Sequence, residues 1–363
     1  MLRYLASALA LLWATETVAL DASAGPVEVQ RVASGLDNPW AIGFLPGDRV
    51  LITEISGRLL LLENGELHVI NGVPPVESDG QGGLLDVLVQ RDFADTREVF
   101  LSFAKKQGRE AGTALMRIRL SSDYRNVADA ETIFEMAAGS SGGLHFGSRI
   151  VEAPSGALFL TVGERGDQPS AQDLSRENGS VVRVNRDGSI PQDNPFVATP
   201  GARAGIWSYG HRNPQGAALD LDGNLIVVEH GARGGDEINR IRRGANYGWP
   251  VIAYGRHYSG AKIGEGIAKD GMEQPDFYWD PSIAPSGLMV YSGRLWPKWR
   301  GDIFVGSLKF DYISRLEGSP LREVERLESK ETNRVRDIRE APDGSIWFLS
   351  VNNGALYRIA PKT

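Results

Sequence analysis

The feature that most constrains this chain is a turn-and-strand unit that recurs six times along it. In each copy a polar turn, usually containing Gly or Asp, leads into a short apolar strand. A second strand follows and usually ends in a basic or polar turn. The leading strands read LPGDRVLITEI (45–55), TREVFLSFA (96–104), PSGALFLTVGE (154–164), LDGNLIVVEHG (221–231), WRGDIFVGSLK (299–309) and PDGSIWFLSVN (342–352). Units of this kind, repeating at ~40–50 residues, are typical of β-propeller blades. The sequence therefore predicts an all-β fold, a six-bladed β-propeller with four-stranded antiparallel blades.

The predicted propeller occupies residues 25–363 as a single domain. The early strand VEVQRVASGL (27–36) has no partner of its own, so we expect it to join the last blade and remove an open sheet edge. The chain has 43 glycines, and its apolar residues fall in short runs without a long helical period, which favours short strands and tight turns. The alternative is a β-sandwich or two β domains, which the regular recurrence and the lack of a linker disfavour.

The N-terminal residues 1–24 are predicted to form a secretory signal peptide. Arg3 gives a positive start, an apolar stretch covers Tyr4–Trp13, and Ala-Ser-Ala at 22–24 is a small-residue pattern for cleavage near Ala24. The apolar stretch is well short of the ~20 residues that a membrane span needs. We expect an exported protein, periplasmic in a bacterium, with no stable membrane insertion after the signal is removed.

Charge and cysteine content exclude several classes of function. A formal net charge of -7 and a pI near 5.4 argue against nucleic acid or an anionic membrane as the main partner. The chain has no cysteine, which excludes thiol nucleophiles, disulfides and zinc ribbons. An acidic chain can still hold a local basic pocket, so an anionic cofactor remains possible.

Histidine is scarce, and one of the five histidines stands in a suggestive place. No two form a His-x-His or His-x-x-x-His pair, which argues against a histidine-built transition-metal site. His145 lies in SSGGLHFGSRI, just before the first strand of the third repeat. A lone loop histidine is more often structural than catalytic. At the strand entry nearest the axis of a propeller, however, a general base would be well placed.

Four cations occupy corresponding strand ends: Arg212, Lys309, Arg334 and Arg336. Arg334 and Arg336 are two residues apart on one strand, so they point to the same face. Each alone would be interpreted as ordinary surface charge. If several blades direct such residues to the inner rim, they form a basic pocket for an anionic small molecule, whose carboxylates the arginine forks would bind.

The loop EHGARGGDEIN (229–239) offers oxygen ligands for a hard cation. Its candidates are Glu229, Asp236, Glu237 and the carbonyls of the Gly-rich turn, a set that suits calcium. The spacing is not that of an EF-hand, and solvated loop acids are the alternative.

Taken in order, the motifs of this chain resemble those of the soluble, pyrroloquinoline quinone (PQQ)-dependent sugar dehydrogenases, in particular the aldose sugar dehydrogenase branch. The resemblance extends from about Val27 to the C-terminus. It is carried by GLDNPWAIGFLPG, GQGGLLDVLV, HFGSRI, GERGD, YGHRNPQG, EHGARGGDEIN, NYGWP, SLK and RVRDIREAPDG. It implies a six-bladed propeller that binds PQQ above Ca2+ at the axial mouth and oxidises aldoses at C1 to lactones.

The resemblance also implies roles for individual residues. His145 corresponds to the general base, and Arg212 is our candidate for stabilising the negative charge that develops on the cofactor. The implied PQQ contacts are Gln81, Arg212, Asn213, Lys309, Arg334 and Arg336. The implied calcium ligands are the carbonyls of Gly231 and Ala232, and, for a further calcium, Glu237 and the carbonyl of Tyr247.

One departure bears on specificity. Glucose-specialised relatives have an Asp just before the catalytic His, where this chain has Leu144, and the chain lacks their long insertions. Both differences favour an open pocket and broad use of aldoses, with an unknown electron acceptor. Two alternatives remain: a calcium-dependent lactonase-type propeller using Glu229, Asp236 and Asn246, and a non-catalytic binding propeller.

Overall fold

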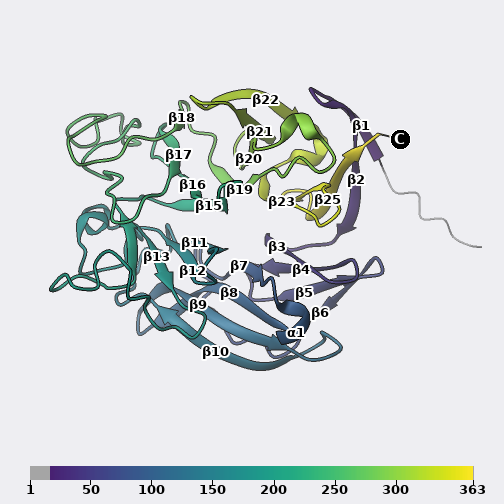
Figure 1. Ribbon diagram of the computed structural model, residues 1–363, viewed down its shortest axis with the longest axis horizontal. Coiled ribbons are helices and arrows are strands. Elements are labelled where there is room, and N and C mark those ends of the chain that lie inside the picture. The colour runs from purple at the N-terminus through teal and green to yellow at the C-terminus, as the bar shows by residue number, and fades with distance from the viewer. Residues whose placement is uncertain (1–16, 363) are drawn as a thin grey trace, which may run out of the picture.

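The computed structural model describes residues 17–362 and has six β-sheets arranged around a central axis (Figure 1). Neighbouring strands in every sheet are antiparallel, and within the described residues the one α-helix is α1 (Phe93–Thr96). The predicted six-bladed β-propeller with four-stranded antiparallel blades is confirmed; the sixth sheet carries one additional outer strand.

Each of the first five blades takes four strands in chain order. Blades one and two consist of β3 (Pro39–Leu45), β4 (Arg49–Glu54), β5 (Leu59–Glu63), β6 (Glu66–Val69), then β7 (Leu84–Val89), β8 (Glu98–Gln107), β9 (Glu110–Leu120) and β10 (Val127–Glu135). Blade three consists of β11 (Gly147–Glu152), β12 (Leu158–Val162), β13 (Ser180–Val184) and β14 (Ile206–Tyr209). Blades four and five consist of β15 (Pro214–Leu219), β16 (Leu225–Glu229), β17 (Asp236–Arg240), β18 (Phe277–Trp279), then β19 (Pro285–Val290), β20 (Ile303–Ser307), β21 (Tyr312–Glu317) and β22 (Arg322–Glu328).

The sixth blade joins the two ends of the chain. Its strands are β23 (Val335–Glu340), β24 (Ile346–Ser350) and β25 (Ala355–Pro361), followed by β2 (Gly25–Ser34) and β1 (Thr17–Ala22) from the N-terminal side. β2 pairs antiparallel with β25, with Val27 opposite Pro361. The prediction that the early strand closes the ring is therefore confirmed, and the closure leaves no open gap between blades one and six.

The repeat visible in the sequence corresponds to the second and third strands of each blade. These are the apolar middle strands, and their side chains pack against the neighbouring blades; one cluster, for example, joins Val228 of β16 to Leu288 of β19 and Val305 of β20. The first strands are innermost, and they contact one another around the axis. They carry buried polar residues instead: Asp86, Arg149, Gln215, Ser286 and Asp337.

The N-terminal prediction is only partly covered by the described residues. Residues 1–16 of the predicted signal peptide lie outside them, whereas 17–22 form β1, which pairs with β2. No helix within residues 17–362 is long and apolar enough to cross a membrane.

Candidate active site

The inner strands all begin at the same end of the axis, and several predicted site residues lie just before these strand starts. Gln81 lies shortly before β7, His145 shortly before β11, Asn213 directly before β15 and Arg334 directly before β23. Residues far apart in the sequence therefore converge on one mouth because every blade enters its inner strand there.

A cavity of about 320 Å³ lies at this mouth. Four of the six predicted cofactor residues line it: Gln81, Asn213, Arg334 and Arg336. Arg334 and Arg336 face the same cavity, as their spacing on one strand predicts. The remaining wall includes the apolar side chains of Trp40, Phe146, Leu308 and Val351 and the amide of Gln215, so the site combines two cations with both apolar and amide surfaces. We call it the central cavity.

His145 is held at the edge of the central cavity by contacts from two directions. Its backbone N–H donates to Oε1 of Gln81 at 2.9 Å, and its Nδ1 lies 2.5 Å from Oε1 of Glu164. The neighbouring residues Phe146 and Gly147 line the cavity. Since Gly163 lacks a side chain, the strand can approach closely; a Cβ there would collide with the carbonyl of His145. With Nδ1 bonded to a carboxylate, Nε2 is the nitrogen that remains available for chemistry.

Gln215 connects two of the cavity residues. Its Oε1 accepts from Nη1 of Arg336 at 3.0 Å, and its Nε2 donates to Oδ1 of Asn213 at 3.1 Å. Burial, together with the positive charges of Arg334 and Arg149, lowers the pKa of Arg336 to about 9. The guanidinium is therefore still charged at neutral pH. Its charged form is destabilised by burial and by the neighbouring arginines, and an anionic ligand would stabilise it.

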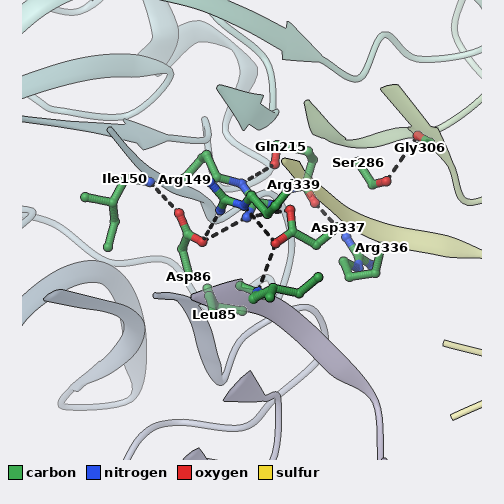
Figure 2. Close-up of polar contacts among 12 residues, drawn as sticks. Leu85, Asp86, Arg149, Ile150, Gln215, Ser286, Gly306, Arg336, Asp337 and Arg339 are labelled. Carbon is green, nitrogen blue, oxygen red and sulfur yellow. Dashed lines mark hydrogen bonds and ion pairs between the residues drawn. The ribbon is translucent and has the colours of Figure 1, made fainter. Parts of the chain in front are cut away.

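Beneath the central cavity, four charged side chains meet at the axis and form what we call the axial cluster (Figure 2). Asp86, Arg149 and Asp337 are buried, and Arg339 is half-buried. Arg149 lies 2.8 Å from Asp86 and 3.1 Å from Asp337, and Arg339 makes ion pairs to both carboxylates. Asp337 also accepts from the backbone N–H of Ile42 at 3.0 Å.

Trp40 lies between the axial cluster and the cavity. The guanidinium carbon of Arg149 lies 4.3 Å from the centroid of its ring, and that of Arg336 lies 5.9 Å away. Such cation–π contacts stabilise both the ring and the cations. The axial cluster thus supports the floor of the cavity through one aromatic side chain.

All four predicted calcium residues line a second, very small cavity of about 20 Å³. Gly231, Ala232, Glu237 and Tyr247 meet there with Glu229. A cavity of this size holds about one water-sized species. Burial, followed by the negative charge of Glu229, raises the pKa of Glu237 to about 8. Glu229 is buried and bonded to Nδ1 of His211 at 2.8 Å, whereas Glu237 is half-buried and forms no ion pair within residues 17–362. A divalent cation would offset the repulsion between these two carboxylates. Within residues 17–362, however, no group of three His, Asp or Glu side chains forms a metal-binding cluster, so backbone carbonyls would have to supply ligands.

Three residues in or near the loop 229–239 have structural partners. Arg212 lines the small cavity, not the central one, and its guanidinium donates to the carbonyls of His230 and Gly231. His230 contacts the carbonyl of Pro285 through Nε2 at 2.6 Å. The carboxylate of Asp236 accepts four hydrogen bonds, from the backbone of residues 231, 283 and 284 and from Ser282.

Lys309 lines neither of these cavities. It lies in a third cavity of about 800 Å³, which shares His230 and Ala284 with the central cavity, and its ammonium lies 4.8 Å from the ring centroid of Phe310. No role for Glu164, Gln215 or Trp40 could be predicted from the sequence. Glu164 and Gln215 do fall within the motifs GERGD and YGHRNPQG, but nothing in their spacing indicates which side chains they meet.

Comparison with known proteins agrees with this geometry. Residues 36–358 match the family model described as Glucose / Sorbosone dehydrogenase. The chain is 41% identical to the aldose sugar dehydrogenase YliI of Escherichia coli over 361 residues, covering 95% of both chains. It is 27% identical to the quinoprotein glucose dehydrogenase B of Acinetobacter calcoaceticus, covering 88% of this chain and 84% of that one.

Solved structures give the same result. The apo-form of the Escherichia coli aldose sugar dehydrogenase superposes with a TM-score of 0.90 at 42% identity, covering 93% of this chain and 100% of that one. The PQQ-bound aldose sugar dehydrogenase of Streptomyces coelicolor has a TM-score of 0.75 at 25% identity, with 92% and 98% covered. The chain belongs to the glucose/sorbosone dehydrogenase family.

Proposed function

We propose that this protein is an exported quinoprotein dehydrogenase that oxidises aldoses at C1 to lactones, using PQQ, Ca2+ and His145 as the general base. One observation carries the proposal. The central cavity brings two arginines and four amide side chains together beside a histidine whose Nδ1 is bonded to a carboxylate. Cations suit an anionic cofactor, and an oriented imidazole suits proton abstraction.

The residues present fit the cofactor. PQQ has three carboxylates, and removing them from water requires fixed cations, which Arg334 and Arg336 provide. Gln81 and Asn213 line the same cavity and offer amide donors. When bound, PQQ supplies a quinone that takes up hydride. Lys309 and Arg212 would reach it from the adjoining cavities, and Arg212 is our candidate for stabilising negative charge on it.

The residues of the small cavity fit calcium. The carbonyls of Gly231 and Ala232 would be ligands of the ion beside the cofactor, and Glu237 with the carbonyl of Tyr247 would be ligands of a further one. Calcium supplies a Lewis acid that polarises a carbonyl without any proton exchange.

His145 would carry the proton chemistry. As hydride leaves C1 of the sugar, the O–H bond at C1 breaks, its proton moves to Nε2 of His145, and C1 becomes the lactone carbonyl. The Glu164 carboxylate holds Nδ1 and stabilises the imidazolium that forms. Leu144, at the mouth and 43% exposed, offers no carboxylate for a particular sugar hydroxyl, which supports broad aldose use.

Reconstitution tests this proposal directly. We expect the purified protein, loaded with PQQ and calcium, to reduce a dye with several aldoses. His145→Ala should lower the rate by ~10²-fold or more while the quinone still binds. His68→Ala, a substitution on outer strand β6, serves as the control and should leave the rate unchanged. Dye reduction by no aldose, from folded and quinone-loaded protein, would contradict the enzymatic proposal.

Two other functions are less well supported. The lactonase alternative needs Asp236 as a metal ligand, but the hydrogen bonds to Asp236 occupy its carboxylate. Lactone hydrolysis by quinone-free protein would nevertheless establish it. A non-catalytic propeller would bind ligands with His145→Ala unchanged and would show no turnover with the wild-type residue.

Export is part of the proposal and has its own test. N-terminal sequencing of the mature protein would locate the cleavage, predicted near Ala24. Cleavage there would remove β1 and also Ser23, which bonds to Glu325, Trp299 and Arg315. Retention of residues 1–24 in exported protein would overturn the signal-peptide prediction.

A further inference from the structure

The 800 Å³ cavity beside the central cavity carries charges that the proposed oxidation leaves without a role. Its volume lies within the roughly 300–1,000 Å³ typical of small-molecule sites. His230 and Ala284 line both cavities, so the two are contiguous. Arg233 and Arg256 line this lateral cavity, and both side chains are exposed.

The two arginines are direct cross-strand neighbours. The N–H of Arg233 donates to the carbonyl of Arg256 at 2.9 Å, and the N–H of Arg256 donates to the carbonyl of Arg233 at 3.1 Å. Residues opposite one another in an antiparallel pair project to the same face. Arg256 is also opposite Lys262 in a second bridge. Like charges directly opposite destabilise a β ribbon, so an anion bound beside these three cations would stabilise it.

No anionic partner in the described part of the chain supplies that interaction. Within residues 17–362 neither guanidinium makes an ion pair or a side-chain hydrogen bond, and the ammonium of Lys262 donates to the carbonyl of Glu265. The one carboxylate among the described lining residues is Asp280, which forms no ion pair with either arginine. Lys309 also lines the cavity, but it is proposed above as a cofactor contact, so Arg233 and Arg256 are the lining cations without a role. This concentration of positive charge stands out in a chain whose formal charge is -7.

Aromatic side chains flank the cations. Tyr254 and Tyr258 line the same cavity. Tyr254 is fixed by stacking on Tyr278, with ring centroids 4.0 Å apart, and by donating its hydroxyl to Gln274 at 2.9 Å. Tyr258 is 75% exposed. Such rings offer an apolar face with a polar edge, which suits the mixed surface of a sugar ring.

We propose that the lateral cavity binds the carboxylate-bearing unit of an acidic oligosaccharide, such as one containing uronic acid, whose reducing end is oxidised in the central cavity. The inference rests on the proposed function and names a substrate class for it. Two adjacent guanidinium forks match the planar geometry of a carboxylate. The concave shape favours a small molecule over an acidic electron-acceptor protein as the occupant.

The test compares an acidic with a neutral disaccharide on the quinone- and calcium-loaded protein, using an uncharged dye. We expect kcat/KM for a galacturonic acid disaccharide to exceed that for maltose at low ionic strength, and the difference to shrink as salt screens the guanidinium charges. Arg233→Gln and Arg256→Gln should each lower kcat/KM roughly tenfold for the acidic sugar and leave the neutral sugar unchanged. Arg322→Gln, an exposed arginine of β22, is the matched control and should change neither.

Several results would overturn the inference. The inference is wrong if Arg233→Gln and Arg256→Gln lower kcat/KM equally for both sugars. It is also wrong if neither substitution changes kcat/KM for the acidic sugar. Weakened PQQ binding in the variants, measured by titration, would assign the arginines to the cofactor. Slower turnover only with an acidic protein acceptor would assign the cavity to that partner.

A binding measurement separates this inference from the oxidation itself. The galacturonic acid disaccharide reduced to its alditol cannot be oxidised at C1, and calorimetry can follow its binding to the quinone-free protein. Binding to the wild-type chain that Arg256→Gln weakens supports the lateral site even if no sugar is oxidised. Absence of binding overturns the site, whatever the outcome of the dehydrogenase assay.

Discussion

At the scale of single residues, His145 is oriented by protein contacts alone. Gln81 holds its backbone and Glu164 holds Nδ1, so the imidazole needs no substrate to select the nitrogen that acts. Because the imidazole is already oriented, proton transfer has a smaller free-energy cost of reorganisation. The carboxylate of Glu164 is therefore a positioning group whose effect should appear in the chemical step.

Glu164→Gln is expected to lower kcat by tenfold or more, because the amide keeps the shape but removes the charge that stabilises the imidazolium. KM for the sugar should change little, and single-turnover kinetics with quinone-loaded protein would locate the loss in the chemical step. Asp167→Asn in the same GERGD segment is a control; its carboxylate pairs with Arg176 and should not affect the rate. A loss of binding instead of rate would contradict the assigned role.

Gln215→Leu is expected to weaken PQQ binding by roughly tenfold, because Arg336 and Asn213 each lose a fixed partner. Quinone titration followed by absorbance measures the affinity. Gln215→Glu keeps an acceptor for Arg336 and should retain more affinity than the leucine variant. Equal affinity in all three proteins would show that Gln215 does not position these groups.

The residues that gather at the mouth could be predicted from the sequence, but those that orient them could not. Gln81, His145, Asn213 and Arg334 could be predicted because each stands at the start of an inner strand in a recognisable motif. The partners of Glu164 and Gln215 lie on other segments of the chain. Which side chains meet across the axis depends on the packing of six blades, and single-sequence patterns do not contain that information.

At the scale of elements, the loop between β16 and β17 combines backbone and acidic oxygens in one small cavity. Its glycines let the chain turn tightly: Gly234 and Gly235 have φ of 83° and 69°, a region where other residues are strained. The loop also carries Arg233, so it contributes to both the proposed metal site and the lateral cavity.

Calcium removal is expected to lower the unfolding temperature, because the metal ion no longer offsets the repulsion between Glu229 and Glu237. A ligand that binds only the folded state stabilises it by RT ln(1 + [L]/Kd). Thermal unfolding with calcium and with a chelator measures the difference. Glu237→Gln should reduce that difference, whereas Glu265→Gln, on the exposed part of the same blade insertion, should preserve it. An unchanged unfolding temperature after chelation would argue against calcium at this loop.

The element pattern was predictable where strands are apolar. The second and third strands of every blade stand out in the sequence, because both of their faces pack against neighbouring blades. The inner strands are less visible, since residues such as Asp86 and Arg149 interrupt their apolar pattern. The polar residues that make these strands hard to recognise in the sequence are the ones that form ion pairs at the axis.

At the scale of the whole molecule, the axial cluster joins blades two, three and six and closes the axis below the cavity (Figure 2). Asp86→Asn is expected to lower the free energy of unfolding by ~3–5 kcal/mol, because Arg149 and Arg339 lose a buried counter-charge. Urea denaturation measures it, with Asp222→Asn in an exposed turn as the control.

A double variant tests whether the loss of stability in Asp86→Asn comes from the ion pair between Asp86 and Arg149. Asp86→Asn combined with Arg149→Met should cost less than the sum of the two single changes, because the second substitution removes the unpaired charge. Strict additivity would mean that the two side chains are not coupled.

Ring closure by β2 and β25 also has a consequence for biosynthesis. β1 and β2 are made before the first blade and β25 is made after the fifth, so a chain emerging from a ribosome or a membrane pore must keep one edge of β2 unpaired until β25 has appeared. Pairing of such distant segments is intrinsically slow. A chain that ends before β25 leaves β2 with a bare edge, and such an edge is prone to aggregation. The position of this one strand thus makes completion of synthesis a requirement for closing the propeller.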